Sequence, residues 1–388
     1  MMLKSIGYRM FALIYSLCKL LPPKRKRVLC IMTHDDGESS NVSLAVNALK
    51  QERTGYSFSY ITKRETLEVK GFSSIKRLVS FFLVKPYQLS RAEIILMDNV
   101  FLPMAYLKRR KSAKVIQLWH GTGTIKKFGQ HVNTGRLKEL EKRANSKITH
   151  LIVNSEETKK LYAEVFGISE DRVYPIGLPK TDELIHRIGD SERLGFNRDK
   201  DSIYHKYAIP AAAKLVLYAP TFRDNELLGT GILNKLFDMQ KWLPEDHYLG
   251  LRLHPFIAEA SKEVVLPPRV CQMSYESDLN SLIMASDILI TDYSSIVFEY
   301  CLTGKPMVFF AYDLREFSDY GRGFYYDYAA YVPGPVTATA EETAAVIREK
   351  QYGTKSIASF RDRNYSYLDG KATERLLDII KQEKPVYL

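Results

Sequence analysis

The sequence predicts an α/β fold in two domains, each built on a parallel sheet. The chain has 388 residues, which is too long for one ordinary domain. Short runs rich in Val, Ile and Leu alternate with stretches of helical periodicity, a pattern typical of parallel sheets covered by helices. A polar segment at residues 189–201 interrupts that alternation, and we place the interdomain region around it.

Two series of strands flank this polar segment. Two such series indicate two Rossmann-like domains facing one cleft, at residues 28–195 and 196–365. We expect a helical segment at 1–27 before them and a C-terminal helix at 366–388 that crosses back. The expected strands are 28–32, 59–61, 93–97, 114–118, 150–153, 173–176, 214–218, 248–253, 270–273, 287–291 and 307–310, and helical stretches include 43–50, 138–144 and 156–166.

Composition limits the class of protein and its partners. Hydrophobic residues make up 45% of the chain and charged residues 26%, which is typical of a globular protein rather than a disordered one. The net charge of +11 favours anionic partners such as phosphates, nucleotides, nucleic acid or an acidic membrane surface. The 4 cysteines have no Cys-x-x-Cys spacing, which indicates a reducing compartment and no structural zinc.

The N-terminal segment has the pattern of an amphipathic helix. Its apolar residues recur at alternating steps of three and four, and a basic cluster follows Pro22-Pro23. The apolar stretch is too short to span a bilayer, and the basic residues after it fit a secretory signal poorly. The apolar stripe is Leu3, Ile6, Met10, Leu13, Leu17 and Leu20, and the basic cluster is Lys24, Arg25, Lys26 and Arg27.

An apolar helical stripe beside a polybasic patch is typical of proteins that lie on an anionic membrane surface. We therefore expect residues 1–27 to associate with a membrane. The alternative is a helix that docks on its own domain.

His120 is the first candidate catalytic residue, because it follows the expected strand 114–118 directly. Open α/β sheets bind ligands at the carboxyl edge, where this imidazole is expected. Gly121 and Thr122 begin a tight turn, and Lys126 and Lys127 make the following loop cationic. Histidine titrates near neutral pH and can take a proton from a hydroxyl. A purely structural histidine is the alternative.

Arg252-x-His254-Pro255 is the second candidate. Pro255 cannot donate to a sheet, so the strand is expected to stop there, with His254 at its exit. Arg252 lies two residues back and is expected to share a face with His254. A histidinium at that position can offset charge on a leaving phosphate. A structural histidine at a strand end is the alternative.

Hydroxyl side chains follow the expected strand 287–291 and precede a helix-like run at 296–302. Ser294 and Ser295, with Asp292 before them, are placed to bind phosphate at a helix N-terminus, although capping alone explains the pattern equally well. Glu299 follows one turn later and can reach a ribose diol, or it is an ordinary surface glutamate.

Thr221 and Arg223 follow the first strand of the second domain. A guanidinium there can hold a phosphate through two parallel hydrogen bonds. A surface salt bridge is the alternative.

Taken together, four motifs carry a family resemblance. His-Gly-Thr, Tyr-Ala-Pro-Thr-Phe-Arg, Arg-x-His-Pro and Thr-Asp-Tyr-Ser-Ser occur in that order between Trp119 and Ser295. The sequence resembles the CDP-glycerol glycerophosphotransferase family of wall teichoic acid synthesis over most of the chain after about residue 90. Its loop after His120 and its N-terminal helix resemble the primase branch, and it lacks the long extra region usual in family polymerases.

The resemblance implies a GT-B fold and a defined reaction. An acceptor hydroxyl attacks the glycerol-bearing phosphate of CDP-glycerol, held mainly by the second domain, and CMP leaves. For a primase, the acceptor is N-acetylmannosaminyl-N-acetylglucosamine on undecaprenyl diphosphate, bound by the first domain. The implied roles are base for His120, pyrophosphate stabilisers for His254 and Arg223, donor contacts for Asp292, Ser294 and Ser295, a ribose contact for Glu299, and a place near the cleft for Glu156, which helix capping also explains.

These implications place the enzyme peripherally on the cytoplasmic face of the bacterial membrane. The sequence offers no acidic cluster suited to a dedicated magnesium site, so we expect no cofactor. Three alternatives stay open: a polymerase of the same family acting on glycerol or ribitol phosphate, a GT-B glycosyltransferase using a nucleotide sugar, and a basic nucleic-acid-binding protein. The last is disfavoured because the basic residues are dispersed and no recognised nucleic-acid motif is present.

Overall fold

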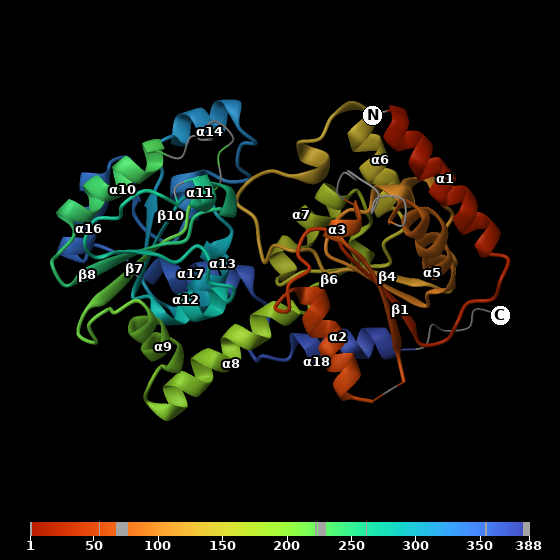
Figure 1. Ribbon diagram of the computed structural model, residues 1–388, viewed down its shortest axis with the longest axis horizontal. Coiled ribbons are helices and arrows are strands. Elements are labelled where there is room, and N and C mark those ends of the chain that lie inside the picture. The colour runs from red at the N-terminus through yellow and green to blue at the C-terminus, as the bar shows by residue number, and fades with distance from the viewer. Residues whose placement is uncertain are drawn as a thin grey trace. The chain divides into compact units, whose positions relative to one another are not determined.

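The computed structural model describes residues 2–53, 55–66, 77–221, 223, 230–260, 262–353 and 355–382. The chain divides into two compact units (Figure 1). Unit 1 comprises Met1–Thr122, Phe128–Glu183 and Tyr365–Leu388, and unit 2 comprises Gly123–Lys127 and Leu184–Asn364.

Unit 1 is built on a six-stranded parallel sheet with the order β2-β1-β3-β4-β5-β6. The strand order reverses between β1 and β3, so the loops after these two strands flank the switch point where such sheets bind ligands. Every residue of β3 and β4 is buried, as expected for central strands covered on both faces. The strands are β1 Arg27–Met32, β2 Ser57–Thr62, β3 Ile94–Met97, β4 Lys114–Gln117, β5 His150–Ile152 and β6 Val173–Tyr174.

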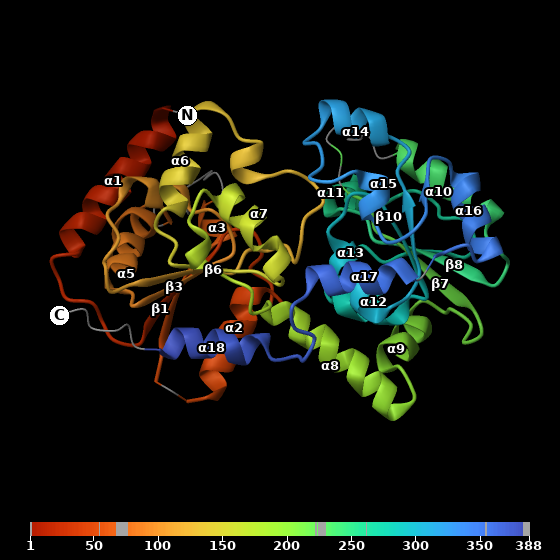
Figure 2. The same ribbon diagram turned by 180° about the vertical axis from the view of Figure 1, so that it is seen from behind.

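Helices cover the sheet of unit 1, and the last helix of the chain returns to it. Helix α18 lies beside α2 (Figure 2), and its residues Leu376, Leu377 and Ile380 join the same buried cluster as Val46. The elements are α1 Met2–Cys18, α2 Asn41–Gln51, α3 Lys63–Thr66, η1 Ser80–Val84, α5 Lys85–Arg91, η2 Leu102–Tyr106, η3 Gly129–His131, α6 Gly135–Asn145, α7 Glu156–Phe166, η4 Glu170–Arg172 and α18 Ala372–Lys381.

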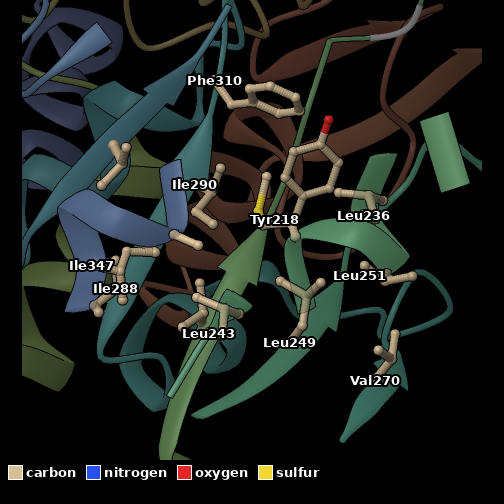
Figure 3. Packing of buried hydrophobic residues seen from close by; sticks show 14 of the residues in the cluster. Tyr218, Leu236, Leu243, Leu249, Leu251, Val270, Ile288, Ile290, Phe310 and Ile347 are labelled. Atoms are coloured by element: carbon tan, nitrogen blue, oxygen red, sulfur yellow. The ribbon is translucent and has the colours of Figure 1, made fainter. Parts of the chain in front are cut away.

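Unit 2 contains a second six-stranded parallel sheet, with the order β12-β11-β10-β7-β8-β9. Its switch point lies between β7 and β10. Tyr218, Leu249, Ile290 and Phe310 come from four of these strands and pack in one buried cluster with Ile347 of α16 (Figure 3). The strands are β7 Lys214–Tyr218, β8 His247–Leu251, β9 Val270–Gln272, β10 Ile288–Thr291, β11 Met307–Phe310 and β12 Val336–Thr337.

The helices of unit 2 alternate with these strands along the chain, as parallel connections require. Helix α8 starts in unit 1 and continues into unit 2. The elements are α8 Pro179–Leu194, α9 Arg198–Lys206, α10 Thr230–Trp242, α11 Pro255–Ala260, α12 Leu279–Ala285, α13 Ile296–Tyr300, η6 Cys301–Thr303, α14 Leu314–Tyr320, α15 Tyr328–Tyr331, α16 Ala340–Glu349 and α17 Lys355–Asn364.

The α/β class and the parallel sheets are confirmed, and each of the eleven expected strands overlaps a strand of the structure. The polar segment 189–201 is largely helical in the structure, because α8 runs through Gly189 to Leu194 and α9 begins at Arg198. The polar residues there lie on exposed helix surface, and Arg193 pairs with Asp190 one turn earlier. The two units divide at Glu183, inside α8, rather than at residue 195.

Helix α1 packs on unit 1 by one face only. Phe11 and Tyr15 are buried, and the Phe11 ring lies 5.3 Å from that of Phe81 and 5.8 Å from that of Phe101. The opposite face is apolar and exposed: Ile6, Met10, Leu13 and Leu17 are 60%, 43%, 62% and 60% exposed, followed by Leu20 at 85%. The side chain of Leu3 lies outside the described residues. No helix in the described ranges is long and apolar enough to cross a membrane.

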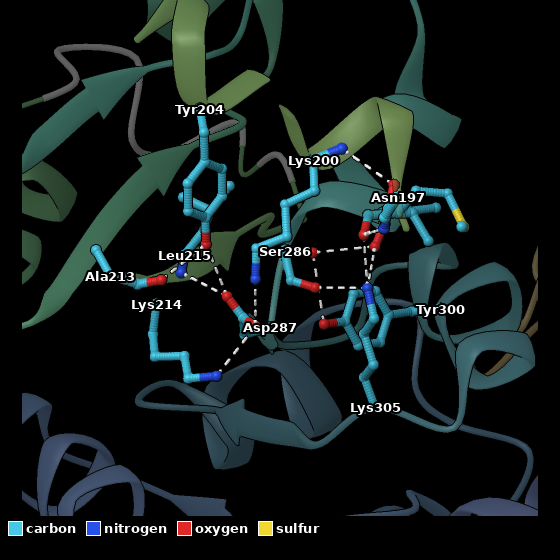
Figure 4. A network of polar contacts seen from close by, with 12 residues as sticks. Asn197, Lys200, Tyr204, Ala213, Lys214, Leu215, Ser286, Asp287, Tyr300 and Lys305 are labelled. Atoms are coloured by element: carbon cyan, nitrogen blue, oxygen red, sulfur yellow. Dashed lines mark hydrogen bonds and ion pairs between the residues drawn. The ribbon is translucent and has the colours of Figure 1, made fainter. Parts of the chain in front are cut away.

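A polar network holds helices and strands of unit 2 together beneath the sheet's amino edge (Figure 4). The Asp287 carboxylate accepts hydrogen bonds from Tyr204, from the Leu215 N–H and from Lys200. Lys305 donates from Nζ to the carbonyl oxygens of Met284 and Ser286, both at 2.7 Å, and of Ile283 at 3.3 Å. An ammonium group therefore satisfies carbonyls that the end of α12 leaves without helical partners.

Replacing Lys305 with Met tests this role. We expect Lys305→Met to lower the free energy of unfolding by about 1–3 kcal/mol, because buried carbonyl oxygens lose their donor. Urea unfolding followed by circular dichroism measures the change, and hydrogen exchange of α12 locates it. Lys214→Met is the control, since Lys214 is half exposed and lies 3.5 Å from Asp287. An equal loss in both variants would contradict a specific role for Lys305.

Candidate active site

In unit 1, the backbone before His120 is held in a strained conformation. Trp119 has φ of +54°, a left-handed conformation that bulky residues rarely adopt. Its N–H donates to Oε1 of Gln117 at 3.0 Å, and its carbonyl accepts from Nδ2 of Asn41 at 3.1 Å. Asn41 also accepts the N–H of Lys180 at 3.0 Å. Strain that is held from both sides is common at functional sites, and here it sets the direction of His120.

A single contact fixes the protonation pattern of the His120 ring. Nδ1 lies 3.0 Å from the carbonyl oxygen of Asp98, the residue that follows β3. A carbonyl oxygen can only accept, so Nδ1 carries the proton. Nε2 is then left with its lone pair, which is the form required to take a proton from a hydroxyl.

The side chain of Asp98 organises the neighbouring loop. Its buried carboxylate accepts the backbone N–H groups of Thr33 at 2.9 Å, His34 at 3.1 Å and Asp35 at 2.8 Å. This places the His34 imidazole parallel to that of His120, with the ring centroids 3.6 Å apart and an interplanar angle of 18°. Asp98 thus joins the loops on both sides of the switch point and stacks a second ring on His120.

Burial and the neighbouring imidazole keep His120 neutral. Burial, and to a smaller extent the nearby His34, lower the pKa of His120 to about 3. Burial also lowers the pKa of His34 from its ordinary value. The arrangement therefore presents an unprotonated imidazole nitrogen at the carboxyl edge of the sheet.

The sequence analysis did not identify four residues of this site: His34, Asp98, Asn41 and Gln117. His34, Asp98 and Gln117 are single polar residues at or near strand ends, Asn41 is the first residue of α2, and none of the four has a motif of its own. The signal that could have found His34 and Asp98 is topological, because both follow the strands that flank the switch point.

The other unit 1 candidates occupy less reactive positions. Thr122 is buried, and its carbonyl oxygen accepts from Nδ2 of Asn154 at 2.8 Å, so the turn begun at Gly121 is tied to the end of β5. Glu156 is exposed at the first position of α7 and pairs with Lys159 at 3.1 Å. Its geometry matches that of a helix-start residue.

In unit 2, a second buried aspartate connects the strands at the switch point. Asp292, at the end of β10, accepts the N–H of Thr221 at 2.7 Å. Its other oxygen lies 2.8 Å from the guanidinium of Arg223. Both Thr221 and Arg223 follow β7, so Asp292 fixes the β7 loop as Asp98 fixes the β1 loop in unit 1.

Arg223 is fully engaged by protein carboxylates rather than presenting an open fork. Nε and Nη2 donate to Asp313 at 2.5 and 2.9 Å, and Nη1 also donates to the Thr221 carbonyl at 2.9 Å. Burial acts to lower the pKa of Arg223, but the bonds to Asp313 and the charge of Asp292 raise it above its ordinary value. Its two-pronged contact, expected for phosphate, is made here with Asp313.

The hydroxyls after β10 remain accessible. Ser295 is exposed and makes no side-chain cap for α13, and Ser294 is half buried with its Oγ 3.5 Å from the Ile296 N–H. The Ser295 side chain therefore does not cap α13. Glu299 is 5% exposed, so it is not an ordinary surface glutamate.

The loop after His120 crosses from unit 1 to unit 2 at Gly123. Lys126 donates to Oγ1 of Thr221 at 3.3 Å, and Lys127 donates its N–H to the Gly323 carbonyl at 3.0 Å. Burial lowers the pKa of Lys126 to about 8. A lysine ammonium thus lies beside Thr221 at the β7 edge.

Arg252 and His254 differ in their surroundings. Arg252 donates from Nη1 to the carbonyls of Ser274 at 2.5 Å and Glu276 at 2.7 Å, which fixes the loop after β9. His254 is exposed between β8 and α11; β8 ends at Leu251, earlier than the expected strand, and Pro255 is the first residue of α11. Within the described ranges, no three His, Cys, Asp or Glu side chains gather as metal ligands.

The family model described as CDP-Glycerol:Poly(glycerophosphate) glycerophosphotransferase matches residues 13–382. The chain belongs to this family. The resemblance expected from the four motifs is thereby confirmed.

Curated relatives of this glycerophosphotransferase family member include both primases and polymerases. The chain is 30% identical to the teichoic acid poly(ribitol-phosphate) polymerase of Bacillus spizizenii over 99% of its own length, but it spans only 61% of that relative. It is 28% identical to the teichoic acid ribitol-phosphate primase of the same organism, covering 94% of this chain and 93% of that one. The glycerol-phosphate primase of Bacillus subtilis is 32% identical, with coverage of 76% and 75%.

Solved structures show the same fold. The wall teichoic acid polymerase TagF, in a variant studied with CDPG, superposes with a TM-score of 0.77 at 26% identity, covering 97% of this chain and 95% of that one. A putative UDP-N-acetylglucosamine 2-epimerase from Listeria monocytogenes matches with a TM-score of 0.60 at 13% identity, which shows a shared fold alone.

The His120 environment predicts its titration. Because the pKa of His120 is lowered to about 3, we expect the ring to stay neutral, with the proton on Nδ1, as the pH falls through 6.5 to about 5. Nitrogen chemical shifts of labelled histidine, assigned with His120→Asn, measure both tautomer and charge. A short histidine-containing peptide is the reference, because an unperturbed histidine has a pKa of about 6.5. Protonation of His120 near pH 6.5 would contradict the assignment.

Proposed function

We propose that this family member is a teichoic acid glycerophosphate primase. In the proposed reaction, a hydroxyl of the lipid-linked disaccharide N-acetylmannosaminyl-N-acetylglucosamine attacks the glycerol-bearing phosphorus of CDP-glycerol. A phosphorus–oxygen bond to the acceptor forms, the bond to CMP breaks, and one glycerol phosphate is transferred. The name of the Bacillus subtilis relative supports glycerol phosphate as the transferred group.

The observation that carries the proposal is the tautomer of His120. Nδ1 is committed to the Asp98 carbonyl, so Nε2 is the atom that accepts the proton of the attacking hydroxyl. The lowered pKa ensures that this nitrogen is unprotonated at neutral pH. We assign unit 1 to the acceptor on this ground.

We assign the donor to the carboxyl edge of unit 2. The hydroxyls of the half-buried Ser294 and the exposed Ser295 and the ammonium of Lys126 suit a diphosphate, and the exposed His254 can offset charge on the departing CMP. Transfer of this kind depends mainly on positioning and charge stabilisation. The proposal calls for no metal cofactor, because protein cations supply the charge.

Substitution of His120 tests the proposal. We expect His120→Asn to reduce acceptor-dependent CMP release from CDP-glycerol by about 10²–10⁴-fold, because the base is lost while an amide N–H remains for the Asp98 carbonyl. His205→Ala, at an exposed position of α9, is the control and should retain wild-type turnover. Turnover by His120→Asn close to wild type would exclude His120 as the base.

A polymerase is the second candidate, since the relative that matches 99% of the chain is named a poly(ribitol-phosphate) polymerase. Product length separates the two, because a primase adds one unit and a polymerase adds many. Parallel reactions with CDP-glycerol and CDP-ribitol identify the polyol. Consumption of a nucleotide sugar instead would favour a glycosyltransferase.

We also propose that α1 rests on the anionic cytoplasmic surface of the cell membrane, where a polyprenyl-linked acceptor lies. The exposed stripe from Ile6 to Leu20 supplies apolar contact, and Lys24 and Arg25 are exposed immediately after it. The buried face of α1 is a separate feature, so docking on unit 1 and membrane contact are compatible.

Introducing negative charge on the exposed apolar stripe tests membrane contact without disturbing the buried face. We expect Leu13→Glu with Leu17→Glu to weaken binding to anionic vesicles by more than about tenfold, because two apolar contacts of roughly 1.5–3 kcal/mol each are lost. Vesicle co-sedimentation measures it. Val265→Glu, at an 89% exposed residue of unit 2, is the control. Complete sedimentation of the double variant would overturn the proposal.

A further inference from the structure

A cavity of about 610 Å³ opens in unit 2 beside the proposed phosphate site. Its lining comes from the segments that follow three strands: Arg223 after β7, Asp313 after β11, and Thr337 and Ala338 at β12. These segments lie at the carboxyl edge of the sheet, and the volume is within the range of about 300–1,000 Å³ typical of small-molecule sites.

Buried contacts connect the cavity wall to the proposed donor phosphates. The Asp313 carboxylate accepts the hydroxyl of Tyr293 at 2.9 Å, and Tyr293 directly precedes Ser294. The same carboxylate holds Arg223, which also pairs with Asp292. The cavity wall and the segment that carries Ser294 are therefore joined by side-chain contacts through Asp313 and Arg223.

The charge of the lining argues against a second anion. The guanidinium of Arg223 is matched by the carboxylates of Asp292 and Asp313. Arg315 and Glu316 bring one charge of each sign to the cavity from the first turn of α14. A lining with no surplus of cations gives little attraction to a phosphate.

The same lining suits a neutral, hydroxyl-rich ligand. Guanidinium groups donate hydrogen bonds and carboxylates accept them, and each hydroxyl of a polyol does both. Arg315 and Glu316 are exposed, so their polar groups can reach a ligand that enters from solvent. A nucleobase would require a broad apolar or aromatic surface. The apolar side chains of the lining are Leu314, Val336 and small alanines, and its aromatic ring, Tyr312, already has the Arg223 guanidinium over it at 4.8 Å and the Lys235 ammonium at 5.0 Å.

We infer that this cavity receives the polyol end of a cytidine diphosphate polyol donor, and that Arg315 and Glu316 contact its hydroxyls. The inference rests on the proposed function and extends it, because contacts beyond the phosphate determine whether glycerol or the longer ribitol is preferred.

Donor binding without an acceptor provides the test, because it requires no transfer. Isothermal titration compares CDP-glycerol, CDP-ribitol and CDP, which lacks the polyol, on wild type, Arg315→Ala and Glu316→Gln. We expect each variant to bind the preferred CDP-polyol about tenfold more weakly, as the loss of a hydrogen bond to a charged group predicts, and to bind CDP unchanged.

Asp319→Asn is the matched control, because Asp319 is exposed on the same helix and is not part of the lining. It should bind all three ligands as wild type does. Equal weakening of CDP and CDP-polyol in the Arg315 and Glu316 variants would show that the cavity holds the nucleotide. Unchanged binding of every ligand would show that these side chains contact none of them, and either result overturns the inference.

Turnover separates the inference from the proposed function. If wild type transfers glycerol or ribitol phosphate while the ratio of kcat/KM for the two donors is the same in both variants, the polyol assignment of the cavity fails alone. If wild type binds and consumes neither CDP-polyol, the proposed function fails and the inference fails with it.

Discussion

A buried aspartate at the switch point of each sheet is the constraint on which both candidate sites depend. Asp98 follows β3 and accepts three backbone N–H groups of the β1 loop, and Asp292 follows β10 and accepts the N–H of Thr221 after β7. Each carboxylate is 1% exposed, so it must be paired, and the loop N–H groups that pair it lose their freedom to move. Each buried carboxylate needs hydrogen-bond donors, and the loop after the neighbouring strand provides them. The same hydrogen bonds therefore fix the positions of the candidate site residues on the two strands' loops.

The strands could be predicted because they are local features. Runs such as 114–118 and 287–291 are apolar over their whole length, and burial on both faces requires that composition. Residues 189–194 were not predicted as helix, because this part of α8 is polar and contains Gly189. Strand β12 was missed because its two residues, Val336 and Thr337, directly follow Pro333-Gly334-Pro335, a run typical of turns, and show no apolar run of their own.

The candidate site was predictable only in part, because strand ends are local features of the sequence whereas side-chain partners depend on contacts between distant segments. His120 and the Ser294–Ser295 pair follow strands and could be placed at the sheet edges from the sequence. Arg223 and Arg252 could be placed as well, but not their partners: one guanidinium holds Asp313 and the other holds loop carbonyls. An arginine guanidinium donates paired hydrogen bonds to a carboxylate as readily as to a phosphate. Only the fold therefore decides which of these groups it binds.

The tautomer, charge and orientation of the His120 ring depend on residues from other segments of the chain, which the local sequence around His120 does not contain. Burial alone would leave either ring nitrogen free to carry the proton, and the Asp98 carbonyl removes that choice. The stacked His34 then disfavours a charged ring, while the strained Trp119 keeps the imidazole at the edge of the sheet. In the proposed reaction this makes His120 a weak but correctly oriented base, whose protonated form is favoured only while the substrate's developing negative charge is beside it. In that proposed role, such a group returns its proton readily once the phosphate has been transferred.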